Sequence, residues 1–449
     1  MGVGMNASGV ATAVVEQARD GRFGEIATRF SPELRAAVSA AALEAGWAAQ
    51  IGEHGPVTAL GEPVAEPAGP GLTRVQVPVV CSRGAFLVVM SVDATGTVAG
   101  LRLAAATGWT KPSYVDETMF GERDVVLSAE PHSVPGTLTV PRGEGPWPGV
   151  VLLSGGGIFD RDETAGPNKP LKDLAWGLAS RGVAVLRFDK VTHAHPELAT
   201  APGFTMSAEY VPYAAAAVRL LQSQDNVDAA RVFVAGHSMG GKVAPLVAIA
   251  EPSVAGLVLL AADAEPMQEA AVRVVRYLAA VDAKVEALVE PITRQAAAVA
   301  DPALSPSAPG DGLLFGYPGS YWLELREYDP VATAASLAVP MFLLQGGRDY
   351  QVTVEDDLSR WRNGLAGPAV DFRVYPADDH EFFPGAGPST PDSYQRPQHV
   401  DPAVVADLAE WLTRGGGAAP GGGPRTPRGR RPPAPPRPAP PPPRAGRRR

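Results

Sequence analysis

The pattern of apolar positions in the first hundred residues indicates helices followed by strands. Leu34, Val38, Ala42 and Trp47 recur at near-helical spacing, and later runs are rich in β-branched residues. Two helices and then three strands are expected, at 10–19, 32–50, 73–80, 85–92 and 98–103. This order is typical of a small α+β domain, which we place at residues 1–106 and follow with a linker at 107–118.

From residue 119 the pattern changes to short apolar strands that alternate with helices. Strands are expected at 125–129, 136–140, 149–153, 183–188, 232–235, 256–260, 340–344 and 371–375, and helices at 170–180, 207–223, 242–250 and 403–413. Such alternation predicts a mostly parallel sheet with helices on both faces, here over residues 119–414. Residues 265–337 interrupt the alternation and predict a cap insertion, in which Tyr317, Tyr321 and Trp322 would shape a pocket.

The charge of the chain is unevenly distributed. The formal net charge is −9, but residues 415–449 contain nine arginines, twelve prolines and no acid, which leaves −18 for the rest. A segment with so few apolar side chains cannot offset its ordering entropy, so this tail is predicted to be disordered. It could contact nucleic acid or anionic surfaces, but we favour a solvated appendage and expect no nucleic-acid partner.

Other classes of protein are excluded by what the sequence lacks. No apolar run reaches the roughly 18 residues of a membrane span, and residues 1–21 do not have the features of a secretory signal. We therefore expect a cytoplasmic protein. The single cysteine, Cys81, excludes an internal disulfide and a cysteine metal cluster, and it lies outside the region where catalysis is expected.

The strongest chemical signal is the sequence Gly-His-Ser-Met-Gly-Gly at 236–241. It directly follows an expected strand and directly precedes an expected helix, as a nucleophile elbow requires. Glycines are needed there because side chains at those positions would clash with the adjoining strand and helix. The sequence predicts Ser238 as a nucleophile; the alternative is a glycine-rich turn with an incidental serine.

A serine nucleophile needs a base and an acid, which follow it in the chain order Ser, Asp or Glu, His in this class of fold. Asp349 and His380 each come after a predicted strand, so both lie at the sheet edge where ligands bind. Asp263 also follows a strand and is the rival acid. Asp378 and Asp379 adjoin the histidine and are expected to cap or solvate its loop.

The remaining histidines are not assigned to the triad: His54 and His132 lie outside its order, and His399 sits in a late loop. His237 is expected to pack inside the elbow, while His193 and His195 could line the pocket or belong to a plain loop. The others, which we leave without a role, are His54, His132 and His399. No spacing of histidines and carboxylates indicates a metal site, so neither a metal nor a cofactor is expected.

Acyl transfer also requires donors for the developing oxyanion, usually backbone N–H groups. The first candidate is the N–H of Met239, directly after the nucleophile. The second is in the Ser-Gly-Gly-Gly run at 154–157, where we choose Gly156. A nucleotide-binding loop is the alternative, but the run matches neither of the usual glycine-rich patterns.

Together these motifs resemble a bacterial α/β-hydrolase group of serine esterases. The resemblance rests on the elbow, the Arg-Asp loop at 348–349, the Asp-His loop at 379–380 and the stretch Asp-Arg-Asp-Glu-Thr-Ala-Gly-Pro-Asn-Lys-Pro at 160–170. In that group a small N-terminal α+β domain of uncharacterised role often precedes the hydrolase. The resemblance implies a carboxylesterase for short- to medium-chain acyl esters, with Ser238, Asp349 and His380 as its triad.

The chain departs from the family pattern at two positions. The family usually has histidine where Ser154 stands and asparagine near Phe159, which leaves substrate choice open. Arg161 and its acidic neighbours are expected to form a structural ion-pair network beside the site. A peptidase, acyltransferase or thioesterase of the same fold, and a non-catalytic binding scaffold, are the alternative functions. The oligomeric state and the role of the N-terminal domain stay open.

Overall fold

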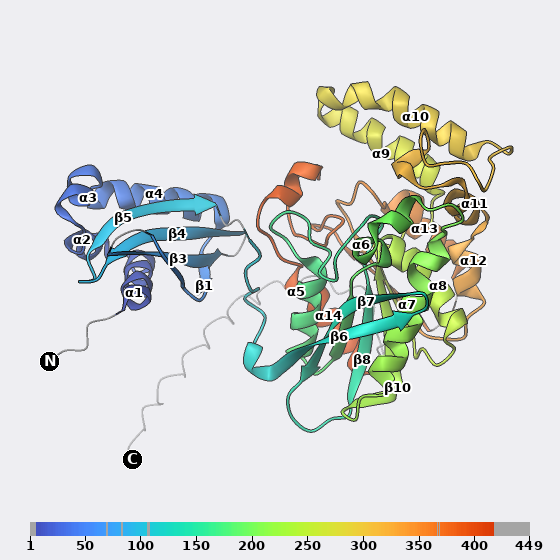
Figure 1. The fold of residues 1–449 in the computed structure, drawn as a ribbon, viewed down its shortest axis with the longest axis horizontal. Coiled ribbons are helices and arrows are strands. Elements are labelled where there is room, and N and C mark those ends of the chain that lie inside the picture. Colours follow the sequence, from blue (N-terminus) through green and yellow to red (C-terminus); the bar gives the residue numbers. More distant parts are fainter. Residues whose placement is uncertain are drawn as a thin grey trace, which may run out of the picture.

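The structure is a computed structural model, which describes residues 6–68, 71–81, 84–105, 108–365, 367 and 369–416. It contains two sheets, one in a small lobe of residues 6–105 and the other in a large lobe of residues 108–416 (Figure 1). Apart from its first two glycines, the predicted tail at 415–449 lies outside the described residues.

The small lobe combines four helices with an antiparallel sheet of order β1-β3-β4-β5, to which β2 adds by pairing with β3. Its elements are α1 (Ala7–Arg19), α2 (Phe23–Thr28), α3 (Pro32–Ala37), α4 (Ala40–His54), β1 (Val57–Leu60), β2 (Val64–Pro67), β3 (Leu72–Cys81), β4 (Gly84–Asp93) and β5 (Val98–Ala105). The helices pack on the sheet through buried side chains such as Ile26, Trp47 and Phe86, which confirms an α+β class.

One helix of the small lobe was predicted with the wrong extent. The expected helix at 32–50 is two helices, because the Ser39 hydroxyl accepts a hydrogen bond from the N–H of Ala42 and so caps a new helix start. Val38 adopts an extended conformation at this break. The helical spacing of apolar residues continues across this break, so the sequence did not show that the chain changes direction between α3 and α4.

The large lobe is built on an eight-stranded sheet of order β13-β12-β11-β10-β8-β9-β7-β6. The strands are β6 (Phe120–Ala129), β7 (His132–Pro141), β8 (Trp147–Leu153), β9 (Ala184–Phe188), β10 (Val227–His237), β11 (Leu257–Leu260), β12 (Met341–Gly346) and β13 (Val370–Tyr375). All neighbours are parallel except the pairs β6–β7 and β7–β9. The strand order and the single reversed strand are those of the α/β-hydrolase fold, which confirms the predicted fold class.

Helices cover both faces of this sheet. One apolar core is formed with α5 (Pro170–Ala179) and α14 (Pro402–Thr413), and the other with α7 (Met206–Gln222) and α8 (Met239–Ala250). The shorter helical elements are η1 (Glu117–Met119), α6 (Val191–Ala194), η2 (Pro196–Thr200), η5 (Val354–Leu358), α13 (Ser359–Gly364) and η6 (Pro391–Gln395). Because both faces are covered, the strands are apolar on both sides, and this is why they were visible as continuous apolar runs.

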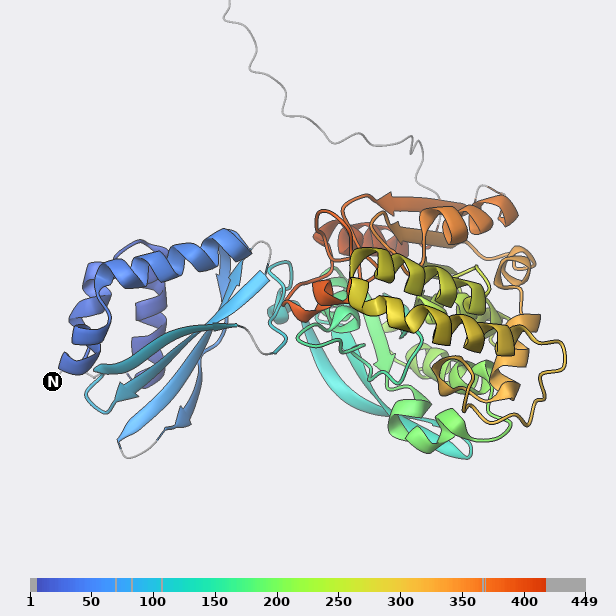
Figure 2. The same ribbon diagram turned by 90° about the horizontal axis from the view of Figure 1, so that it is seen from above.

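The segment between β11 and β12 does not form one layer. It contains α9 (Met267–Val281), η3 (Ala283–Val285), α10 (Glu286–Ala300), η4 (Leu314–Gly316), α11 (Gly319–Glu327) and α12 (Pro330–Ala335). The pair α9–α10 stands over the rest of the large lobe (Figures 1 and 2). In contrast, Tyr321 and Trp322 of α11 are fully buried in the core beside α7, which corrects the expectation that both shape the pocket.

Among the described residues, no helix combines the length and apolar character needed to cross a bilayer.

Candidate functional site

The candidate nucleophile lies in a sharp turn between β10 and α8. Ser238 has φ 52° and ψ −121°, a strained conformation for a residue with a side chain. Its N–H donates to the carbonyl oxygen of Leu260 at 2.8 Å, which fixes the turn against β11. The helix that starts at Met239 directs its N-terminal N–H groups toward this point, where negative charge is favoured.

The glycines of the elbow are required by close backbone contacts. A Cβ atom at Gly236 would lie 2.1 Å from the carbonyl oxygen of Gly240, and one at Gly240 would lie 2.6 Å from that of Leu153. At Gly241 a Cβ would lie 2.7 Å from the Cβ of Ala262. The helix therefore approaches the sheet more closely than any side chain at these positions would permit.

His380 and Asp349 come together at the carboxyl edge of the sheet. The Nδ1 atom of His380 lies 2.7 Å from Oδ2 of Asp349, and both side chains are buried. The other carboxylate oxygen accepts the N–H groups of Gln351 and Val352 at 2.8 and 2.9 Å. Burial alone would lower the pKa of His380, but the attraction of Asp349 outweighs it, so the pKa is raised above its usual value of 6.5.

The rival carboxylates have other partners. Asp263 forms an ion pair with Lys242 at 2.5 Å, between their Oδ2 and Nζ atoms. Asp379 accepts the N–H groups of Glu381 and Phe383, and so caps its own loop as expected. Burial raises the pKa of Asp378 to about 8 and that of Asp379 to about 6. Among these acids, Asp349 is the one hydrogen-bonded to the ring of His380 in the described structure.

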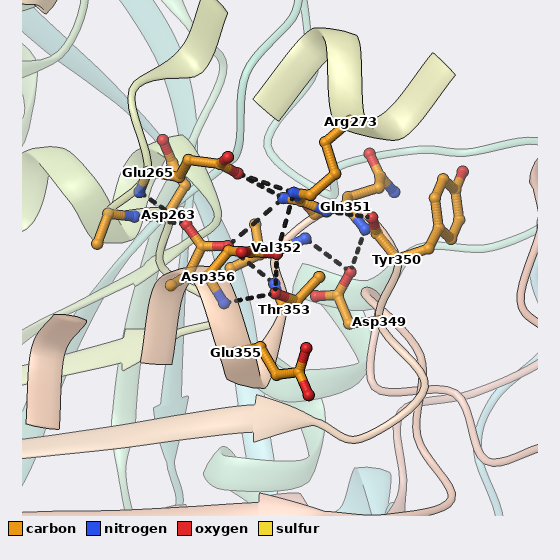
Figure 3. Close-up of polar contacts among 12 residues, drawn as sticks. Asp263, Glu265, Arg273, Asp349, Tyr350, Gln351, Val352, Thr353, Glu355 and Asp356 are labelled. Carbon is orange, nitrogen blue, oxygen red and sulfur yellow. Dashed lines mark hydrogen bonds and ion pairs between the residues drawn. The ribbon is translucent and has the colours of Figure 1, made fainter. Parts of the chain in front are cut away.

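An arginine of α9 ties the overlying helix to the loop of Asp349 (Figure 3). The guanidinium of Arg273 donates to the carbonyl oxygens of Tyr350 and Gln351 at 3.0 and 2.9 Å. It also forms ion pairs with Glu265 at 2.8 Å and Asp356 at 3.2 Å. The position of α9 and the conformation of the acid-bearing loop are thus coupled through one side chain.

A cavity of about 550 Å³ opens between the elbow and α9, and Ser238 and His380 both line it. Its apolar wall includes Ile158, Phe159, Ala199, Met267, Ala270, Ala271, Val274, Phe315, Tyr317 and Val352. Of the aromatic residues expected to shape a pocket, Tyr317 does so. His193 and His195 are absent from the described residues that line the cavity, and the ring of His195 packs against that of His132.

The glycine run after β8 also borders this cavity. Gly155, Gly156 and Gly157 all line it, and a Cβ atom at Gly156 would lie 3.7 Å from the Cβ of Met239. The structure therefore brings the two predicted oxyanion donors, Gly156 and Met239, next to each other and to Ser238. The N–H of Gly155 is already used, because it donates to Oε1 of Glu163 at 2.7 Å.

A group of two acids and a histidine, which the sequence did not reveal, lies beside the nucleophile: Glu163 and His237 are buried and Glu381 is half-buried. The Nδ1 atom of His237 lies 3.0 Å from Oε1 of Glu163, and its Nε2 atom lies 2.9 Å from the backbone oxygen of His380. Burial would lower the pKa of His237, but Glu163 and Glu381 together raise it to about 10. Burial also raises the pKa of Glu381, to about 7.

These three side chains have the composition of a metal-binding group. Their ligand atoms lie within 4.8 Å of one another. However, both ring nitrogens of His237 already have hydrogen-bond partners, and Oε1 of Glu163 is shared with the N–H of Gly155. The contacts are those of a protonated histidine between two acids, so the group requires no ion to account for it.

The acidic stretch at 160–163 forms the ion-pair network expected of it. Arg161 pairs with Asp189 at 2.8 Å, and the buried Arg187 pairs with both Asp162 and Glu122 at 2.8 Å. These contacts join the loop after β8 to strands β6, β7 and β9. Within the stretch, Glu163 contacts the glycine run directly, by accepting the N–H of Gly155.

Comparisons with known proteins agree with this fold. Residues 169–384 match a family model described as serine aminopeptidase, S33. The chain is 37% identical over 341 residues to esterase EstD of Thermotoga maritima, a match that covers 74% of this chain and 77% of that protein.

Solved structures similar to the chain include the esterase domain of a Rhodothermus marinus protein and an esterase of Pyrococcus furiosus. The first is 20% identical, with a TM-score of 0.40, and the match covers 66% of this chain and 99% of that one. The second is 17% identical, with a TM-score of 0.44, and the match covers 69% and 98%. On the strength of its identity to EstD, the chain belongs to the esterases of the α/β-hydrolase family.

Proposed function

We propose that this hydrolase is a serine carboxylesterase, with catalysis carried out by residues 119–414. Ser238 is the nucleophile, His380 the base and Asp349 the acid that orients it. The observation that carries the proposal is the buried hydrogen bond between His380 and Asp349 in a cavity that Ser238 also lines. The strained backbone of Ser238 supports it, because such strain is kept where a side chain must be presented to a substrate.

The proposed reaction has two steps, with His380 carrying the proton in each. Nδ1 of His380 bonds to Asp349, so Nε2 takes the proton of Ser238 as its oxygen attacks the ester carbonyl. The N–H groups of Met239 and Gly156 hold the oxyanion. The alcohol leaves with the proton from His380, and a water molecule then releases the acid from the acyl-enzyme by the same route.

The cavity favours uncharged acyl groups of short to medium length. Its volume of about 550 Å³ lies in the usual range for small-molecule sites. Side chains of α9 and η4 supply much of the apolar wall. Asp263 and Glu163, which line the cavity, are neutralised by Lys242 and His237, and the described lining includes no lysine or arginine. A negatively charged acyl chain therefore finds no free basic counter-ion there.

A peptidase of the same fold is the second candidate, since the matching family model is described as an aminopeptidase. An aminopeptidase must bind the α-ammonium group of its substrate, and Glu381 is the acid at the cavity that lacks a basic side chain bonded to it in the described structure. Its raised pKa of about 7 makes it a weak counter-ion near neutral pH. Ester hydrolysis is therefore favoured over an aminopeptidase reaction.

Hydrolysis of p-nitrophenyl esters from C2 to C12, compared with an aminoacyl p-nitroanilide, tests the proposal. We expect a preference for esters of short or medium chain, and labelling of Ser238 by a fluorophosphonate. Ser238→Ala should lose both, while Ser253→Ala, at an exposed serine beyond the C-terminal end of α8, should keep both. A faster anilide reaction would favour the peptidase, and unchanged ester hydrolysis in Ser238→Ala would eliminate the serine mechanism.

A further inference from the structure

Two buried side chains form hydrogen bonds to the peptide group between Gly155 and Gly156. The carbonyl oxygen of Gly155 accepts hydrogen bonds from Nζ of Lys190 at 3.0 Å and from the hydroxyl of Tyr210 at 2.7 Å. Lys190 lies between β9 and α6, Tyr210 belongs to α7, and both are about 2% exposed. Two donors from different elements thus converge on one oxygen, in a region that water does not reach.

Lys190 is completely satisfied in this position. Its three hydrogen-bonding directions are taken by the carbonyl of Gly155, by the hydroxyl of Tyr210 at 2.7 Å and by Glu209 at 3.1 Å. Burial lowers the pKa of Lys190, and the attraction of Glu209 opposes that shift. Glu209 is itself held by the hydroxyls of Thr192 and Tyr321, each at 2.7 Å. Because the members of this network are buried and hydrogen-bonded to one another, the network holds Lys190 and Tyr210 in fixed positions.

The geometry of a peptide bond links this network to the cavity. In a trans peptide the C=O and N–H groups point in opposite directions, and the described cis peptides are elsewhere, before Pro131 and Pro146. Holding the oxygen of Gly155 on one side therefore determines where the N–H of Gly156 points on the other. Gly156 lines the cavity together with Ser238.

The network is needed because the run it holds has little stiffness of its own. Three consecutive glycines have no Cβ atoms to restrict their backbone, so the peptide plane between two of them can rotate at small energetic cost. On the other side, Glu163 accepts the N–H of Gly155 at 2.7 Å. Rotation of the Gly155–Gly156 plane would leave Lys190 and Tyr210 with unsatisfied buried donors, which is strongly unfavourable.

We propose that Lys190 and Tyr210 are positioning residues for the oxyanion. By donating to the carbonyl of Gly155 they orient the next N–H toward the reacting carbonyl, and they polarise the amide so that this N–H becomes a stronger donor. The inference rests on the proposed function, in which Gly156 is an oxyanion donor. Neither side chain contacts the substrate; both act through the peptide group.

Tyr210→Phe is the cleanest test, because it removes one hydroxyl and keeps the ring in the core. We expect kcat for a p-nitrophenyl ester to fall about tenfold, less than the 10²–10³-fold loss typical of a deleted oxyanion donor, with KM changed less than about twofold. Tyr213→Phe is the matched control, at a buried tyrosine of the same helix that belongs to the apolar core. It should retain the wild-type kcat.

Affinity for a trifluoromethyl ketone separates positioning from general damage to the fold. Ser238 adds to such a ketone through its oxygen and passes its proton to His380, which gives a tetrahedral adduct with an oxyanion. Tyr210→Phe should weaken this inhibitor by the same factor as it lowers kcat/KM, while inhibition by the product carboxylic acid stays unchanged. Lys190→Met combined with Glu209→Gln, which removes the buried pair together, should lower kcat further.

The results separate a failure of the positioning role from a failure of the proposed esterase function. If wild-type esterase activity depends on Ser238 but Tyr210→Phe keeps its kcat and its affinity for the ketone, the positioning role is wrong and the proposed function stands. A loss of kcat without any loss of ketone affinity would also overturn the positioning role. If the wild type does not hydrolyse esters through Ser238, the proposed function itself is wrong.

Discussion

The buried pair of Glu163 and His237 makes the stability of the protein depend on pH, and Glu163→Gln should weaken this dependence. The substitution keeps the size of the side chain and an oxygen that can accept the N–H of Gly155, but it removes the negative charge 3.0 Å from the imidazole. The histidine is 5% exposed, so water screens the pair very little.

The magnitude follows from the raised pKa of His237. A rise from 6.5 to about 10 corresponds to about 5 kcal/mol at most, of which about 4 kcal/mol is present at pH 7. Because the folded pKa is raised, this stabilisation is complete below pH 6.5 and is lost as the pH increases through 10. Glu381 also attracts the imidazole and will retain part of the effect, so we expect Glu163→Gln to lose about 3 kcal/mol at pH 7.

Urea unfolding of both proteins at several pH values between 7 and 10 measures the effect. The difference in unfolding free energy should be largest at pH 7 and should decrease to about 1 kcal/mol or less near pH 10, where His237 is losing its proton in the wild type. Glu251→Gln, which disrupts the more exposed pair with Arg219, is the control and should change stability by less than about 1 kcal/mol.

Parallel stability curves for the wild type and Glu163→Gln across this range would contradict the charged pair of Glu163 and His237. Such curves would mean that the imidazole is neutral in the folded protein and that Glu163 acts only as a hydrogen-bond acceptor. A direct measurement of the imidazole by NMR would then show titration of His237 near or below 6.5 rather than near 10.

Three further predictions concern the base, the support network and the elbow. Since Asp349 raises the pKa of His380, the acidic limb of the kcat/KM profile should have its midpoint above 6.5, and Asp349→Asn should move it to lower pH and lower the plateau about 10⁴-fold. Arg187→Met leaves Glu122 without its cation and Asp162 with Lys169 alone, and should lower the urea-unfolding free energy by about 3 kcal/mol. Gly236→Ala would place a methyl group 2.1 Å from a backbone oxygen, so soluble expression or the melting temperature should drop sharply, and a variant of wild-type stability would contradict the structure.

Much of the large lobe could be predicted because its strands are buried on both faces. Such strands are continuous apolar runs, and β8, β9 and β12 were found within a residue or two of their bounds. Strands β1 and β2 were missed, since they are short and none of their residues is buried. The start of β10 at Val227 was missed because Asp228 and Arg231 interrupt the apolar run and this part of the strand is partly exposed.

Some residues of the site could be predicted from the local sequence, whereas others depend on contacts between positions far apart in the chain. Ser238 was predicted because the elbow is a short sequence with its own steric requirements, and Asp349 and His380 because each follows a strand. The contacts of Lys190 with Gly155 and of Glu163 with His237 join positions 35 and 74 residues apart, and no local pattern encodes them. The pair of charged residues Asp189 and Lys190, which comes right after the buried strand β9, was the one available signal.

The contacts of Arg273 affect whether the cap of this protein can be replaced by the cap of another hydrolase. The insertion point before α9 carries Glu265, and the loop that follows β12 carries Asp356 and Asp357, all facing the same guanidinium. A cap transplanted from another hydrolase without a cation at this place would leave three acids crowded against one another beside Asp349. We therefore expect a cap exchanged into this protein to need a cation at the same junction, so designed chimaeras should keep the arginine together with the helix.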